Sequence, residues 1–217
     1  MIKSKGLFIS FEGGEASGKT TQIKILKNWL INEKIPHILT REPGGTKFSE
    51  YLRKLILSSK INIDTNMEVL LLMAARLDHI DKIIKPALNK NKIVICDRFV
   101  DSTAIYQGHY NNFGIKKVFD LHKLFLNNLL PNITFFFNSN SELVKKRLIK
   151  RKYKNKYDLI DKKFNNSINT AYLKLAKKNK RFKIIDASLS IKDIHNIIRT
   201  ILLKKITNYG FKKSKYK

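Results

Sequence analysis

The chain alternates between short apolar runs and longer stretches in which apolar residues recur every three or four positions. The short runs predict β-strands at Leu7 to Phe11, His37 to Thr40, Ile93 to Cys96, Ile133 to Phe137 and Phe182 to Ile185. The longer stretches predict helices at Thr20 to Asn32, Lys47 to Leu57, Asn66 to Leu88, Lys116 to Asn128, Ser141 to Lys150, Asp161 to Lys178 and Ser190 to Ile206. Because strands separated by helices are typical of parallel sheets, we predict an α/β fold with a five-stranded parallel sheet flanked by helices on both faces.

Length and composition favour one domain. The 217 residues and 43% apolar content are enough for a sizeable core, and no repeat or linker rich in glycine or proline divides residues 1–208. The lysine-rich end, 209–217, is predicted to be a frayed tail. No apolar run reaches the roughly 18 to 20 residues that span a bilayer, and no signal-peptide pattern is present, so we expect no membrane partner.

The charge is strongly basic, with 44 lysines and arginines against 17 aspartates and glutamates and a net charge of +27. Such an excess is typical of proteins that bind nucleic acid. Here the lysines are scattered over most of the predicted helices, so we expect no specific nucleic-acid surface. The single cysteine, Cys96, excludes a disulfide framework or a zinc cluster and indicates a cytoplasmic location.

A glycine-rich loop follows the first strand. The run Gly13-Gly14-Glu15-Ala16-Ser17-Gly18-Lys19-Thr20 matches G-x-x-x-x-G-K-[ST] between a predicted strand and a predicted helix. In that context backbone N–H groups and the helix N-terminus face phosphate oxygens, the lysine reaches the β- and γ-phosphates, and the threonine hydroxyl can ligate Mg²⁺. A turn that binds nothing is the alternative, but the flanking strand and helix favour a nucleoside triphosphate.

Polar residues also follow the next two strands. The segment Arg41 to Thr46 follows the second strand, and Asp97-Arg98-Phe99, then Ser102-Thr103 and Tyr106-Gln107-Gly108, follow the third. Ligands of open parallel sheets bind outside the carboxyl ends of the strands. These groups are therefore predicted to meet the phosphate loop at one edge of the sheet.

Together these motifs resemble one known family. The phosphate loop FEGGEASGKTT, then TREPGGT, the helical LLLMAARLDH and CDRFVDSTAIYQG occur in the order found in bacterial thymidylate kinase, over most of the chain. The resemblance implies transfer of the γ-phosphoryl group of ATP to dTMP, giving dTDP and ADP. It also implies a homodimer formed by helix packing. Mg²⁺ is the expected cofactor.

The resemblance assigns roles to individual residues. ATP is expected to contact Gly13, Gly14, Glu15, Ala16, Ser17, Gly18, Lys19, Thr20 and Thr21. The metal ligands are expected to be Thr20 and Asp97. The residues expected around dTMP are Glu15, Glu42, Pro43, Phe48, Arg53, Leu72, Arg76, Arg98, Ser102, Thr103, Tyr106 and Gln107. Catalytic roles are implied for Lys19, Arg98, Arg151 and Lys156.

Within this set, Arg98 and Arg53 are expected to hold the acceptor phosphate, and Arg76 with Thr103 to read the thymine. From the residues alone, a solvated helix face is the preferred interpretation of Arg76. The family pattern also implies an ion pair between Arg41 and Glu42 behind the acceptor. His79 is expected to be structural.

Two positions depart from the family pattern. Leu72 stands where an aromatic ring usually stacks on thymine, and weaker nucleotide binding is expected. Ala16 stands where some members carry a phosphate-loop arginine, so we expect the transition-state cation to come from a lid over residues 147–158, with Arg147 at its start. The alternative is that the basic run 151–157 is only a solvated loop.

Other functions remain open at this level. A kinase of another nucleotide would share the ATP site but not the set Arg76, Thr103 and Tyr106. A P-loop ATPase that remodels nucleic acid would account for the basic charge. A nucleotide sensor without catalysis is disfavoured, since binding alone does not require Lys19, Thr20 and Asp97 together.

Overall fold

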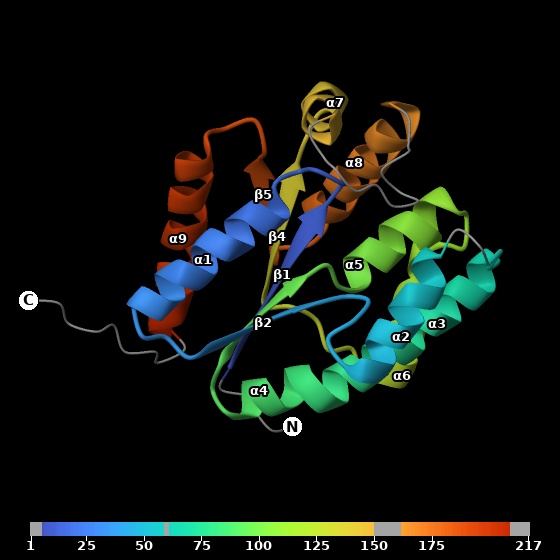
Figure 1. The fold of residues 1–217 in the computed structure, drawn as a ribbon, viewed down its shortest axis with the longest axis horizontal. Helices are drawn as coiled ribbons and strands as arrows, with labels where there is room; N and C mark the ends of the chain where they lie inside the picture. The colour runs from blue at the N-terminus through green and yellow to red at the C-terminus, as the bar shows by residue number, and fades with distance from the viewer. Residues whose placement is uncertain (1–5, 59–60, 150–161, 209–217) are drawn as a thin grey trace, which may run out of the picture.

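A single parallel sheet organises the molecule (Figure 1). The computed structural model describes residues 6–58, 61–149 and 162–208. The strands are β1 (Leu7–Gly13), β2 (His37–Arg41), β3 (Ile93–Asp97), β4 (Ile133–Asn138) and β5 (Phe182–Asp186), in the order β2-β3-β1-β4-β5. All four pairings are parallel, which confirms the predicted fold class.

The helices between the strands follow the predicted order. Their bounds are α1 (Lys19–Asn32), α2 (Lys47–Leu57), α3 (Thr65–His79), η1 (Ile80–Ile84), α4 (Lys85–Asn89), α5 (Val100–Thr103), η2 (Ala104–Tyr110), α6 (Ile115–Leu126), α7 (Ser141–Ile149), α8 (Lys162–Lys177) and α9 (Ile191–Asn208). No helix in the described ranges is both long and apolar enough to cross a membrane.

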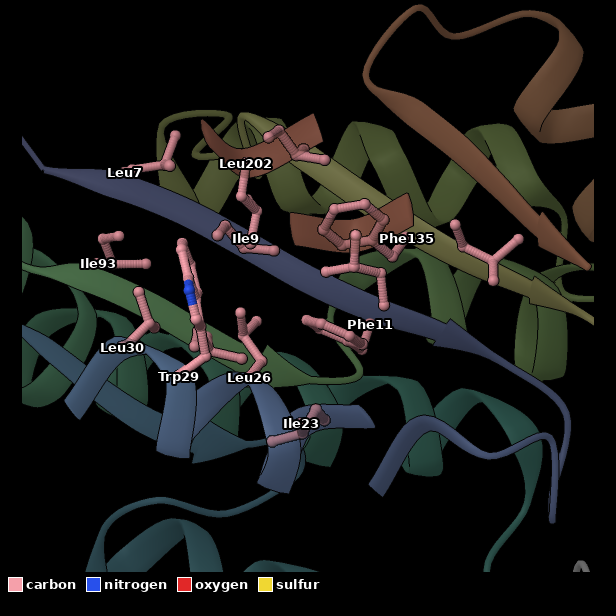
Figure 2. Close-up of a cluster of buried hydrophobic side chains, with 14 of the residues drawn as sticks. Leu7, Ile9, Phe11, Ile23, Leu26, Trp29, Leu30, Ile93, Phe135 and Leu202 are labelled. Carbon is pink, nitrogen blue, oxygen red and sulfur yellow. The ribbon is translucent and has the colours of Figure 1, made fainter. Parts of the chain in front are cut away.

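Alternation along the central strand β1 supplies a core on each face of the sheet. Leu7, Ile9 and Phe11 pack against α1 and α9, whereas Phe8 points to the opposite face, toward α3, η1, α4 and α6. Figure 2 shows Phe11 directed at the apolar side chains of α1, among them Ile23 and Leu26. The sheet is therefore covered by helices on both faces, as predicted.

Two local features of the structure were not predicted. The single helix predicted over Asn66 to Leu88 is α3 followed by a π-helical segment, η1, and the short helix α4, which has Pro86 in its first turn. A proline lacks the N–H that would donate the next α-helical hydrogen bond. The change from α-helical to π-helical hydrogen bonding leaves the spacing of the apolar residues almost unchanged, so the apolar pattern does not reveal it. The segment after β3, predicted only as polar residues beyond a strand, forms α5 and η2.

The sheet register brings the predicted motifs together. Asp97, at the end of β3, pairs with Phe11 of β1 on one side and with Arg41 of β2 on the other. Three strands thus end at the same edge, and the phosphate loop leaves β1 at that point. This edge positions the candidate site.

Candidate functional site

A cavity of about 790 Å³ opens at the carboxyl edge of the sheet. Most of the side chains assigned from the sequence line it: Glu15, Ala16, Ser17, Gly18, Lys19, Thr20, Thr21, Glu42, Pro43, Arg53, Leu72, Arg76, Asp97, Arg98, Ser102, Thr103, Tyr106 and Gln107. Phe48 does not belong to this lining; it is 48% exposed on α2. The expectation that Phe48 packs near the nucleoside therefore has no support from its position.

The phosphate loop folds around the ammonium group of Lys19. Its Nζ donates to the carbonyl oxygens of Gly13 (3.0 Å) and Gly14 (2.7 Å) and to Ser17 Oγ (3.1 Å). Gly13 has φ 138°, and a Cβ there would lie 2.9 Å from the carbonyl oxygen of Phe137, so only glycine fits. Burial, and next the positive charge of Arg98, lower the pKa of Lys19 to about 8.

Thr20 and Asp97 meet beside the loop. Thr20 Oγ1 lies 3.5 Å from Asp97 Oδ2, and Asp97 Oδ1 is buried without a hydrogen-bond partner among the described residues. Asp97 does not cap the helix that follows it, because the N-terminus of α5 has no side-chain cap hydrogen bond. A hydroxyl and a carboxylate with an unused oxygen fit Mg²⁺, which takes one or two protein ligands and completes its shell with water and phosphate oxygens.

Arg98 is fixed from several sides at the end of β3. Its backbone is left-handed (φ 69°), held by an N–H that donates to the Phe11 carbonyl over 3.0 Å. The guanidinium donates through Nη1 to the Gly13 carbonyl (2.9 Å) and to Ser102 Oγ (3.2 Å), and it forms an ion pair with Glu15. It also lies 5.2 Å from the ring centroid of Tyr106. These contacts aim a cation into the cavity.

Arg76 is buried inside the cavity wall. Only 2% of it is exposed, so the solvated helix face is excluded. Its Nε donates to Glu42 Oε2 (2.6 Å) and its Nη2 to Thr103 Oγ1 (2.8 Å). On the other carboxylate oxygen, His79 Nδ1 lies 3.0 Å from Glu42 Oε1. Burial opposes the charge of Glu42, but Arg76 and His79 outweigh burial and lower the pKa of that carboxyl.

In the described part of the chain, Arg41 and Glu42 do not form the expected ion pair with each other. Arg41 pairs with Glu50 over 2.8 Å at the surface, whereas Glu42 points inward to Arg76. The reason is the extended backbone at the end of β2, where successive side chains point to opposite sides. Arg53, from α2, donates to the carbonyl oxygen of Pro43 over 2.9 Å and so fastens the neighbouring turn.

Arg147, expected at the start of the lid, lies on α7 against the phosphate loop. It donates to the carbonyl oxygens of Ala16 (3.2 Å), Ser17 (3.0 Å) and Ala187 (3.0 Å). It therefore ties the loop to the segment after β5. The two other lid candidates, Arg151 and Lys156, lie outside the described residues.

Two buried residues at this site, Glu12 and Tyr172, were missed from the sequence, whereas His79 is structural as expected. His79 contacts both Glu42 and Thr40, whose Oγ1 lies 2.5 Å from its Nε2. Glu12 is fully buried and bonded to Ser102 and Tyr172. A carboxylate inside an otherwise apolar strand is a signal that could have revealed Glu12, since such groups are almost never buried without partners. Nothing in the local sequence points to Tyr172.

Comparisons with known proteins agree on one family. A family model described as Thymidylate kinase matches residues 11–198. A thymidylate kinase of Mycoplasma capricolum subsp. capricolum is 41% identical over 204 residues, 92% of this chain and 96% of that protein. One from Rickettsia bellii is 42% identical over 197 residues, 90% of this chain and 95% of that protein. The crystal structure of thymidylate kinase from Ehrlichia chaffeensis gives a TM-score of 0.71 at 32% identity and covers 91% of this chain and 98% of that one.

Proposed function

The chain belongs to the thymidylate kinase family, and from this premise we propose how its residues carry out the reaction. As a member it is a nucleoside monophosphate kinase, a phosphotransferase that uses nucleotide substrates. We infer that the phosphate loop binds ATP, that the part of the cavity around Arg76 binds dTMP, and that the products are ADP and dTDP. The reducing cytoplasm suits the single, buried cysteine, Cys96.

One observation carries this proposal. Lys19 Nζ and Arg98 Nη1 both donate to the same carbonyl oxygen, that of Gly13, over 3.0 and 2.9 Å. Lys19, from the side proposed to bind ATP, and Arg98, from the side proposed to bind dTMP, thus place their positive charges close together in the cavity. Two phosphate groups that repel each other can be brought together in line there, which is the main requirement of phosphoryl transfer.

The metal completes the donor side. Thr20 and Asp97 would hold Mg²⁺, which supplies charge neutralisation for the β- and γ-phosphates when it is bound. Lys19 stabilises the charge on the transferred group. Arg147 keeps the loop in place through its three backbone contacts.

The acceptor side is a buried polar wall. Arg76 and Thr103 together present a guanidinium and a hydroxyl of fixed orientation to a pyrimidine edge, because Glu42 holds the arginine. A site built to hydrogen-bond a base discriminates against one that leaves these groups unpaired. Leu72 and Ile56 supply the apolar side of the same wall.

Substituting Thr103 with valine tests this assignment. We expect the preference for dTMP over dCMP and dUMP, measured as kcat/KM from Mg-ATP-dependent ADP release, to fall about tenfold, since one hydrogen-bonding group at the base edge is lost. The exposed Thr200 of α9, changed to valine, is the matched control. If the wild type prefers another monophosphate, the acceptor assignment is wrong; ADP release that appears only with DNA would instead support the nucleic-acid ATPase.

We also propose that the protein forms a homodimer through α3 and α6. Met67, Leu70 and Leu77 are 51%, 59% and 41% exposed along one stripe of α3, and Leu124 and Phe125 are 71% and 54% exposed on α6. The two helices lie side by side (Figure 1). Apolar residues at helical spacing on two adjacent helices fit the same surface of a second copy, as in an isologous dimer.

A double substitution on this surface tests the dimer. Leu70→Lys with Leu124→Lys is expected to halve the mass measured by light scattering during gel filtration, because four lysines would be buried between the two copies. Ile31→Lys, on α1 and 51% exposed, is the control and should leave the mass unchanged. A wild-type protein that elutes as a monomer at micromolar concentration would contradict the proposal.

A further inference from the structure

Glu12 is a buried carboxyl that the assignments above leave without a role. It is the penultimate residue of β1 and has no exposed surface. Its Oε1 accepts the Phe99 N–H over 2.7 Å. Its Oε2 lies 2.6 Å from Ser102 Oγ and 3.0 Å from the Tyr172 hydroxyl. The carboxyl therefore holds the segment that follows Arg98 and contacts α8 on its other side.

The three oxygens of Glu12, Ser102 and Tyr172 form a closed triangle. The third side, between Ser102 Oγ and the Tyr172 hydroxyl, is 3.0 Å. Each side needs one proton to be a hydrogen bond, but the two hydroxyls together carry only two. A protonated Oε2 supplies the third, so that each oxygen donates once around the ring. The geometry thus fits a neutral Glu12, and no heavy atom needs to move when the proton arrives.

The environment of Glu12 also favours its neutral, protonated form. Burial, and next the Asp101 carboxylate, raise the pKa of Glu12 to about 8, although hydrogen bonds from Ser102 and Tyr172 oppose this. Asp101 itself forms an ion pair over 2.6 Å with Arg181, the residue that precedes β5. Among the described residues, the other charged or titratable groups that interact with Glu12 are Arg98 after β3, Cys96 of β3, Lys19 of α1, Tyr106 of η2 and Tyr172 of α8.

Glu12 is coupled to the acceptor cation through one side chain. Ser102 Oγ, which contacts Glu12, also accepts the hydrogen bond from Arg98 Nη1 over 3.2 Å. An ionised Glu12 competes electrostatically with any anion for Arg98. A neutral Glu12 leaves the positive charge of Arg98 available, while the Phe99 contact still fixes the backbone.

We propose that Glu12 is a positioning residue of the acceptor site that takes up a proton from solution when the anionic acceptor binds. This inference rests on the proposed function, because it takes Arg98 as the ligand of the acceptor phosphate. Negative charge brought beside a carboxyl favours its protonated form. At pH 8 the free protein has Glu12 about half protonated, so acceptor binding takes up at most about half a proton there.

Titration calorimetry measures this proton directly. The heat of dTMP binding at pH 8 is compared in buffers of different ionisation enthalpy, such as Tris and HEPES, for the wild type, Glu12→Gln and Glu142→Gln. Glu142 is an exposed carboxylate of α7 and serves as the matched control. Lys19 also has a pKa of about 8 and can take up a proton of its own. The contribution of Glu12 is therefore the proton uptake of the wild type minus that of E12Q. We expect E12Q to take up several tenths of a proton less than the wild type for each dTMP bound, and E142Q to take up as much as the wild type.

A second measurement needs only the wild type. Infrared difference spectra on dTMP binding at pH 8 should gain a protonated-carboxyl band above the thymine carbonyl region. Equal proton uptake by wild type and E12Q, both of which bind dTMP, would overturn the inference; so would the absence of the infrared band. Failure of the wild type to bind dTMP at all would instead overturn the proposed function, and the inference with it.

Discussion

Replacing Lys19 with methionine is expected to lower kcat for dTMP phosphorylation by roughly 10²- to 10³-fold, the usual effect of removing one preorganised donor that stabilises transition-state charge. Its ammonium is the cation on the ATP side of the cavity, and it lies 3.0 Å from the Gly13 carbonyl oxygen that Arg98 also contacts. Methionine keeps the length and apolar stem of lysine but removes the charge. Because the charge on the transferred phosphoryl group develops in the transition state, kcat should fall more than the affinity for ATP.

Steady-state rates with saturating dTMP and Mg-ATP check this expectation. Lys27→Met, an exposed position on the same helix, is the control for the loss of one lysine from α1 and should keep full turnover. With a pKa of about 8, wild-type Lys19 is charged below that pH and neutral above it, so ATP binding by the free enzyme should weaken as the pH rises from 7 to 9. If K19M retained turnover within a factor of two of the wild type, Lys19 would not be the catalytic cation.

The second large effect is expected at Arg98. Arg98→Lys should lower kcat/KM for dTMP about 30-fold or more, equivalent to about 2 kcal/mol, while the KM for ATP stays close to that of the wild type. Lysine keeps the charge, but it lacks the planar fork with which Arg98 reaches the Gly13 carbonyl, Ser102 and Glu15 together. The orientation of the cation is therefore lost, and with it the in-line approach of the acceptor.

Initial rates at varied dTMP and fixed ATP measure this loss. Arg199→Lys is the matched control, since Arg199 of α9 lies over the Trp29 ring of α1 and is not among the residues that line the cavity. Its kcat/KM should match the wild type. Equal losses for dTMP and ATP in R98K would show that Arg98 supports the whole loop instead of the acceptor.

The elements and the phosphate loop were predictable because their signals are local. Phe8 to Phe11 alternate between two apolar faces, which requires a strand buried on both sides. Gly13 needs a backbone conformation and a close approach to Phe137 that only glycine tolerates. The order of the motifs then placed Lys19, Thr20 and Asp97 at one edge, because parallel strands end on the same side.

Pairing across the cavity was not predictable in the same way. Whether Arg76 is solvated or buried depends on Glu42, which lies 34 residues earlier and meets it only when β2 and α3 pack together. The adjacent residues Arg41 and Glu42 were expected to pair with each other, but the extended backbone sends them to opposite sides. Helical periodicity likewise did not register the π-helical offset after His79.

The sequence by itself determined the fold class, the phosphate loop and the family motifs, since short-range periodicity and backbone requirements specify them. Only the tertiary structure decided which buried charges meet. Glu12, Ser102 and Tyr172 come from β1, α5 and α8, and their contact spans up to 160 residues of chain. Such contacts are set by how helices pack onto the sheet, because an isolated polar group buried by that packing must find its partner in space rather than along the chain.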